Sequence, residues 1–347
     1  RSEMCIRDRL YVITYDALDR EDVRTVGYIP SITVTLDHDY DRYGNRSRLT
    51  VDDGQVLVND YAYDKLDRLT QAILPGSQVF TLDYYANDDR RTIDHPNGVA
   101  TAYVYRPNGP VESITITKST GELIEQFAYT YDAVRNVATM SDGDGTHGYQ
   151  YDGLDRLTDA THPPGIGLPE VENFAYDKVG NREDADNPND WQYNANNQLV
   201  DSPLGAFLFD EDGGQLSYPG GGAGTFDGFN RLAAYSGESL LSTFSYDPFG
   251  ERVAQETDEV GVHYLWLSGR LIAEYDGFGQ REKGYYYLPG DASPLFVSDR
   301  NGQYSVNLDR LGTPRSLIRI SSQEVVWRLR RCMKTIFFNV RPKQRNK

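Results

Sequence analysis

The chain has 347 residues and a formal net charge of −17, with 39% hydrophobic and 25% charged residues. It is long enough to bury a core, and its acidic charge argues against sequence-independent binding of nucleic acid, which needs clustered Lys and Arg. Its 26 Tyr and 32 Gly favour strands joined by tight turns, and therefore an all-β chain. The two cysteines, Cys5 and Cys332, provide neither a disulfide framework nor a metal-ligand spacing.

Residues 1–10 are expected to be a non-native or disordered lead. The string RSEMCIRDR resembles translated adapter sequence rather than coding sequence, and Cys5 within it is given no role. Because the chain begins with Arg1, a native start is expected upstream, and the lead says little about targeting. No stretch of the chain approaches the ~18 apolar residues of a membrane-spanning helix.

Residues 11–290 form an array in which an aromatic residue followed by Asp recurs, mostly every 16 to 26 residues. This interval fits one β-hairpin per repeat. Degenerate copies, such as Tyr193-Asn194 and Phe209-Asp210, fill gaps in the series. The aromatic–acid pairs are Tyr15-Asp16, Tyr40-Asp41, Tyr63-Asp64, Tyr131-Asp132, Tyr151-Asp152, Tyr176-Asp177, Phe226-Asp227, Tyr246-Asp247 and Tyr275-Asp276.

The residues after each pair predict a tight turn. In YDPFGER, Asp247 takes the first turn position, Pro248 the second and Gly250 the fourth, which are the preferences of a type I turn. YDKVGNR, with Tyr176, Asp177 and Gly180, has the same spacing.

In a second class of repeat, Asp or Asn replaces the Gly and the following Arg comes one residue earlier. YDKLDR, with Tyr63 and Asp64, and YDGLDR, with Tyr151, Asp152 and Arg156, belong to it. Asp and Asn tolerate the left-handed backbone second best to Gly, so we expect a slightly shorter loop of related shape.

Alternating segments between the turns predict half-buried strands at 31–37, 112–119 and 262–269. Longer loops are expected at 141–148, 161–170 and 218–225, and very little helix anywhere. Tyrosines near the strand ends are expected to bury their rings while their hydroxyls stay hydrated.

The repeat resembles the YD repeat of RHS proteins, which also occurs in teneurins and wall-associated proteins. The resemblance covers roughly residues 11–328. A second signature, within residues 291–328, is similar to the start of the RHS-associated core. It comprises YSVNLDRLGTPRSLI and EVVWR, and the matching residues are Asp309, Leu311, Gly312, Thr313, Pro314 and Trp327.

This resemblance implies a β-hairpin strip that curls into a hollow shell around a variable C-terminal toxin, exported by a bacterial secretion system. The expected partners are that toxin domain and the secretion machinery, the expected location is secreted or on the cell surface, and no cofactor is implied. With about thirteen repeats and half a core, we expect an incomplete, open spiral. An adhesive module of the cell surface that binds glycans through tyrosine-rich strands is the alternative.

Catalytic interpretations of these residues are weaker. Tyr-Asp-x-x-Asp-Arg resembles an acid–base cluster, but an enzyme normally needs one site, whereas this string recurs at turn after turn. Five histidines stand singly, without metal-ligand spacing: His38, His95, His147, His162 and His263.

Many relatives in the family cleave themselves after the core, at a motif of the Asp-Pro-x-Gly type. Asp247-Pro248-Phe249-Gly250 resembles it but precedes the core, so we interpret it as a turn. Residues 329–347 depart from the family pattern and are expected to be a divergent basic tail, from truncation or frame disruption. Residues 328–347 hold eight Lys or Arg and no acid.

Overall fold

The structure is a computed structural model that describes residues 2–6, 9–27, 29–107, 109–183, 190–218, 221–237, 240–258 and 260–328. Every element in these ranges is a β-strand or a turn, which confirms the all-β prediction. The described residues contain no helix that could span a membrane. Residues 329–347, the expected basic tail, lie outside the described residues.

The first sheet has 16 strands, each antiparallel to its neighbours in the chain and in strict sequence order. A hairpin alone is marginally stable, and pairing every hairpin with the next removes all but the two outermost edges. The first strand lies in the expected lead, and its non-native origin stays a prediction. The strands are β1 (Ser2–Ile6), β2 (Arg9–Tyr15), β3 (Glu21–Val26), β4 (Val34–Tyr40), β5 (Arg46–Asp52), β6 (Val56–Tyr63), β7 (Leu69–Leu74), β8 (Gln78–Tyr84), β9 (Arg90–Asp94), β10 (Ala100–Tyr105), β11 (Val111–Thr117), β12 (Leu123–Tyr131), β13 (Val137–Asp142), β14 (Gly145–Tyr151), β15 (Leu157–Thr161) and β16 (Val171–Asn173).

Two small sheets follow, with short strands, and a 13-stranded sheet completes the described chain in the same sequential order. The small sheets consist of β17 (Ala175–Tyr176) with β18 (Arg182–Glu183), and of β19 (Gln192–Tyr193), β20 (Leu199–Ser202) and β21 (Gly205–Ala206). The last sheet consists of β22 (Leu208–Phe209), β23 (Gln215–Tyr218), β24 (Gly222–Phe226), β25 (Leu232–Gly237), β26 (Leu240–Tyr246), β27 (Arg252–Thr257), β28 (Gly261–Leu267), β29 (Arg270–Asp276), β30 (Arg281–Tyr286), β31 (Phe296–Asp299), β32 (Gly302–Leu308), β33 (Pro314–Arg319) and β34 (Val325–Arg328).

Two of the expected loops are mostly strand. The segment 141–148 is a hairpin in which Asp142 pairs with Gly145, so only two residues form the turn. Within 218–225, β24 begins at Gly222, and a side chain there would collide with the Tyr235 ring of the neighbouring strand. The glycines that suggested a loop therefore permit close packing inside a sheet. The loop predicted at 161–170 is present after β15.

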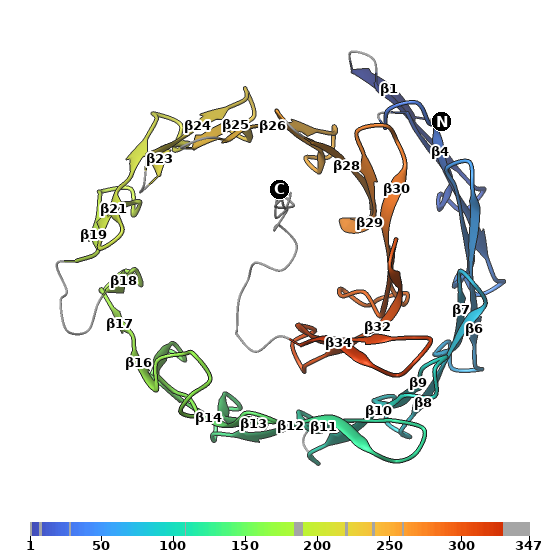
Figure 1. The fold of residues 1–347 in the computed structure, drawn as a ribbon, viewed down its shortest axis with the longest axis horizontal. Helices are drawn as coiled ribbons and strands as arrows, with labels where there is room; N and C mark the ends of the chain where they lie inside the picture. The colour runs from blue at the N-terminus through green and yellow to red at the C-terminus, as the bar shows by residue number, and fades with distance from the viewer. Residues whose placement is uncertain are drawn as a thin grey trace, which may run out of the picture.

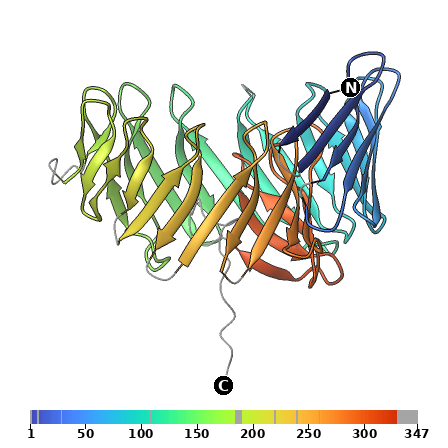
Figure 2. The same cartoon turned by 90° about the horizontal axis from the view of Figure 1, so that it is seen from above.

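The strip of hairpins curves into a ring, and its last hairpins lie inside the arc of its first ones (Figure 1). From the side, the strip is a band whose turns line its two edges (Figure 2). The described strands form four separate sheets rather than one closed sheet, as expected for an incomplete spiral.

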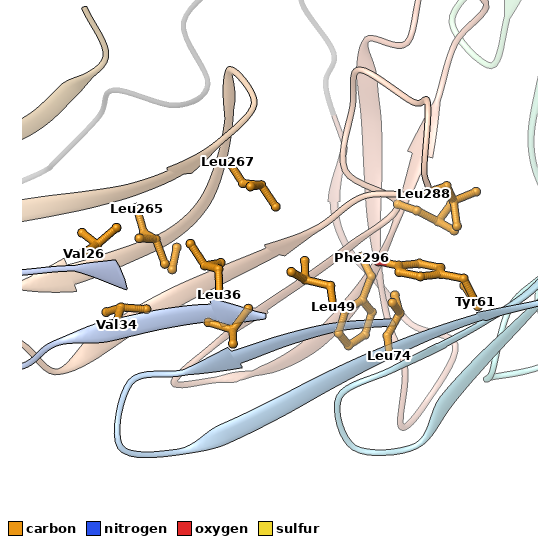
Figure 3. Packing of buried hydrophobic residues seen from close by; sticks show 14 of the residues in the cluster. Val26, Val34, Leu36, Leu49, Tyr61, Leu74, Leu265, Leu267, Leu288 and Phe296 are labelled. Atoms are coloured by element: carbon orange, nitrogen blue, oxygen red, sulfur yellow. The ribbon is translucent and has the colours of Figure 1, made fainter. Parts of the chain in front are cut away.

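The main core lies where the two layers overlap. Leu265, Leu288 and Phe296 of the inner layer pack against Leu36 and Leu74 of the outer layer (Figure 3). A second cluster joins β10–β13 to Ile318 of the inner β33. Between β14 and β26 few side chains are buried, because a single sheet without a second layer leaves both faces partly wet.

Candidate functional site: the repeated turns and the seam

Each repeat turn is built on its first Asp. In the 152–156 turn, Asp152 Oδ1 accepts hydrogen bonds from the backbone N–H of Leu154 (2.9 Å) and of Arg156 (3.0 Å). The Asp155 N–H donates to the Asp152 carbonyl (3.1 Å), and the Asp152 N–H donates to the Arg156 carbonyl (2.9 Å). This pattern is a type I turn followed by one left-handed residue, a common hairpin connection.

The two classes of repeat have the same loop length, so the expected shorter loop is wrong. Asp155 has φ 60° and Gly180 has φ 95°, and both are the fourth residue of their turns. The fifth residue differs: Arg156 Nε donates to Asp152 Oδ2 (2.7 Å), whereas Asn181 Nδ2 donates to Asp177 Oδ2 (2.8 Å). The Arg therefore takes the position and role of the Asn, and the loop is not shortened.

These aspartates are poor general acids. The hydrogen bond from the Arg156 side chain lowers the pKa of Asp152, and that from Arg68 lowers the pKa of Asp64. Both carboxylates therefore stay ionised at neutral pH and bind their own turn. A catalytic acid would need the opposite shift.

The repeat tyrosines join neighbouring hairpins. In most repeats the hydroxyl donates to the backbone carbonyl of the fifth residue after the turn-forming residue of the preceding repeat, where the strand pairing shifts its register. We call this contact the tyrosine clasp. It adds to the expectation of hydrated hydroxyls, because each clasped hydroxyl donates its hydrogen bond to a backbone carbonyl of the protein. Tyr275 differs, because its hydroxyl donates to the Asp53 carboxylate (2.9 Å). The clasps include Tyr63 to Arg46 (3.0 Å), Tyr151 to Val137 (3.1 Å), Tyr176 to Leu157 (2.9 Å) and Tyr246 to Leu232 (2.8 Å).

The turn arginines cover the clasped rings. Arg156 lies 4.5 Å from the centre of the Tyr176 ring, and Arg231 lies 4.7 Å from the centre of the Tyr246 ring. A guanidinium at this distance is attracted by the face of an aromatic ring. The Arg thus binds the Asp of its own turn and the Tyr of the next repeat. This link was missed from the sequence, although the regular Tyr-to-Arg spacing could have indicated it.

Asp247 differs from the other turn aspartates. Its Oδ1 accepts from the N–H groups of Phe249 (2.9 Å) and Glu251 (2.8 Å), so the Asp-Pro-Phe-Gly string does form a turn, closed at Gly250. The fifth residue is Glu251 rather than Arg or Asn, and Asp247 is only 6% exposed. Burial raises the pKa of Asp247, although its backbone hydrogen bonds oppose the shift.

The core motif contains the same turn. Asp309 Oδ1 accepts from the N–H groups of Leu311 (2.9 Å) and Thr313 (3.0 Å), and Gly312 has φ 76°. Pro314 begins β33, where it pairs with Leu308. Trp327 lies on β34 and lines a cavity of about 400 Å³ with Tyr304 and Leu317, among other residues.

Ion pairs and close contacts fix the seam, by which we mean the overlap between outer strands β3–β14 and inner strands β28–β34. Arg281 binds Asp53 (2.7 Å), and Arg315 binds Asp142 (2.9 Å). Gly279 lies so close to the Pro30 carbonyl that any side chain would clash there. These two ion pairs and the close approach of the backbones at Gly279 show that the facing surfaces of the two layers are complementary.

Two of the histidines that stand singly in the sequence come together at the outer layer. His147 Nδ1 lies 2.8 Å from His162 Nδ1, and His162 Nε2 lies 3.0 Å from Glu172. The hairpin register that aligns β14 with the end of β15 brings them together, and no sequence spacing indicates this. Within the described part of the chain, no group of three or more His, Cys, Asp or Glu residues could hold a metal ion.

The geometry defines an all-β strip of hairpins, curled into an incomplete shell. Solved structures of Tc toxins contain this fold. One is titled a Photorhabdus luminescens Tc holotoxin pore with the mutation TccC3-D651A, and it matches 91% of this chain with a TM-score of 0.68 and 15% identity. A crystal structure of TcdB2-TccC3-TEV matches 92% with a TM-score of 0.65, and one of TcdB2-TccC3-Cdc42 matches 90% with a TM-score of 0.59, both at 15% identity.

The chain spans about a fifth of the length of these solved chains. At such low identity the likeness shows the fold, and it confirms the fold that the resemblance to RHS proteins implied. No protein-family model and no curated protein matches the sequence.

Proposed function

We propose that this chain is part of the wall of an RHS-type shell that encloses a C-terminal toxin, and that its role is structural rather than catalytic. The observation that carries the proposal is the tyrosine clasp, which recurs along the strip and joins neighbouring hairpins in most repeats. Because the clasp recurs in repeat after repeat, it joins the hairpins into a continuous barrier. A binding or catalytic site would instead gather unlike groups at one place.

The curvature of the strip supports confinement. The inner hairpins end at β34, on the concave side of the ring (Figure 1). A polypeptide that continues from Arg328 therefore starts inside the curve. A toxin domain downstream would be covered by this wall and by further hairpins of the same kind, and it would reach its target after export by a secretion system.

The glycan-binding alternative has less support. Stacking on sugar rings needs open aromatic faces, whereas the Tyr40, Tyr176 and Tyr246 rings are covered by an arginine of the preceding turn. A saturable signal of the isolated protein on a glycan array would favour adhesion over confinement.

Protection from protease tests the proposal. A small folded reporter domain is fused after Arg328 in place of residues 329–347, and its cleavage by the protease is followed over time. We expect strong protection in the wild type and faster cleavage in Arg90→Ala, which breaks the seam. Arg91→Ala is the matched control, because Arg91 pairs with Asp83 on the exposed surface. Equal cleavage in the presence and absence of the wall would contradict confinement.

A further inference from the structure

Large apolar side chains stand at the tips of the repeat turns. The residue two places after the turn-forming Asp is apolar in turn after turn, and it is exposed by 65% to 82% in the set that we call the apolar crown. Turn tips are ordinarily polar, so an exposed apolar residue kept at one turn position is unusual. The crown comprises Leu18, Leu66, Val134, Leu154, Val179 and Phe229.

The crown lies along one edge of the strip. In a sheet of sequential antiparallel strands, every second turn is on the same edge, and the turns β2–β3, β6–β7, β12–β13 and β14–β15 share this parity. Neighbouring turns on one edge are two strands apart, a distance of about 10 Å. The tips therefore form a row that follows the curved rim of the band (Figure 2).

One tip already shows what such a residue packs against. Phe249 occupies the same turn position, and its ring lies 5.3 Å from the ring of Tyr11 on β2 (centroid to centroid, tilted by 54°). This contact occurs where the strip overlaps itself. The surface that this tip touches is therefore another piece of the same strip, and Phe249 stays 60% exposed.

Charges beside the crown favour a second rim over a lipid surface. Lys65 and Lys178 directly precede crown residues, and the exposed Asp67 and Asp155 directly follow them. Insertion of the tips into a bilayer would dehydrate these carboxylates, which is costly. A facing rim of the same kind instead offers Lys65 and Lys178 as partners for these carboxylates, while the net charge of −17 on the whole chain disfavours contact elsewhere.

We propose that the apolar crown is a self-association surface whose partner is the crown of a second copy of this chain. The tips are spread around the ring from Leu18 to Phe229. A partner that contacts all of them at once must therefore present a ring of the same circumference. Two copies related by a two-fold axis use the same rim on both sides of the contact, so the assembly is complete at two copies. Tyr43, Phe249 and Leu311 occupy the same turn position, which brings the number of tips to nine. At on the order of 100 Å² of buried surface per tip, together they approach the roughly 800 Å² per partner of a stable interface.

Sedimentation velocity over a range of protein concentrations tests this proposal. The wild-type protein is expected to form a dimer that dissociates on dilution. The triple variant Leu66→Ser/Leu154→Ser/Val179→Ser is expected to weaken association by at least about tenfold, because it removes central apolar contacts. The matched control, Val56→Ser/Leu204→Ser/Phe278→Ser, alters exposed apolar residues at or beside turns of the opposite edge, among them Phe278 at the same turn position, and should leave the dimer intact.

Charge reversal keeps the test independent of folding. Lys65→Glu/Lys178→Glu preserves every apolar tip and is expected to weaken the dimer, with an effect that diminishes at high salt. A wild-type protein that is monomeric at all concentrations would overturn the proposal. So would open-ended aggregation, equal weakening by the control variant, or flotation of the protein with phosphatidylglycerol vesicles as a monomer.

Discussion

Arg90 of β9 and Asp291, which follows β30, are 201 residues apart in the chain and are joined by two parallel hydrogen bonds of 3.0 Å. The pair connects the outer layer of the strip to the inner one. It therefore reports directly whether the C-terminal hairpins lie inside the arc of the N-terminal hairpins, as Figure 1 shows.

Replacement of Arg90 by Ala is expected to lower the free energy of unfolding by about 1–3 kcal/mol, because Asp291 then loses its partner in a half-buried position. Arg91→Ala, which removes an exposed ion pair, should change it by less than about 1 kcal/mol. Chemical denaturation of both variants measures the difference. Equal effects would mean that Arg90 and Asp291 are not in contact.

Tyr176→Phe is expected to cost about 1 kcal/mol, since it leaves the Leu157 carbonyl without the donated hydrogen bond (2.9 Å) of the tyrosine clasp. The ring and its contact with Arg156 are unchanged in this variant. Tyr15→Phe is the control, because Tyr15 is 46% exposed. Indistinguishable denaturation midpoints for the two variants would argue against the clasp.

The fourth turn position should accept Asn in place of Gly but not a β-branched residue. Gly180→Asn is expected to change stability by only a few tenths of a kcal/mol, whereas Gly180→Val is expected to cost about 1–2 kcal/mol at φ 95°. Gly153→Val, at the second turn position with open space around it and without a positive φ, is the control. If Gly180→Val were as stable as Gly153→Val, the left-handed geometry would be wrong.

Asp247→Asn and Asp152→Asn should respond to pH with opposite signs. Burial raises the folded-state pKa of Asp247, so its contribution to stability is present below its unfolded pKa and is lost as the pH rises through the folded pKa. The pKa of Asp152 is lowered by Arg156, so its contribution is present above the unfolded pKa and is lost as the pH falls through the folded pKa.

At neutral pH, Asp247→Asn is therefore expected to stabilise the protein and Asp152→Asn to destabilise it, with both differences vanishing in acid. Thermal unfolding between acidic and neutral pH measures them. Asp247→Ala, which also removes the acceptor of two backbone hydrogen bonds, is expected to cost about 1 kcal/mol in acid and less at neutral pH, where it also removes the buried carboxylate. Two Asn variants with the same sign would refute the distinction between the two aspartates.

The sequence was sufficient for the fold class and for the position of the turns, because both depend on local chemistry. Asp at the first turn position and Gly, Asp or Asn at the fourth form the turn within five residues, so their spacing can be recognised in the sequence. The strand expected at 31–37 begins three residues later, at Val34, because Ser31 has φ 63° and belongs to the preceding turn.

The contacts between layers could not be predicted in this way. Arg90 and Asp291, or Tyr275 and Asp53, meet only after the strip has curled, and the curvature is the sum of small twists over many strands. The clasp of Tyr176 on Leu157 depends on the register of neighbouring hairpins, which a one-residue shift would abolish.

Cross-linking of the two layers tests the curled strip most directly. Gln323, in the last inner turn, donates a hydrogen bond to the Ser119 hydroxyl of the outer layer (3.1 Å), 204 residues away. With Cys5 and Cys332 replaced by Ser, cysteines at 119 and 323 should be joined within one chain by a short bifunctional maleimide. Cysteines at 119 and 204 are the control and should not be joined. Absence of the 119–323 link in folded monomer, or equal linking of the control pair, would contradict a wall whose last hairpins lie inside its first.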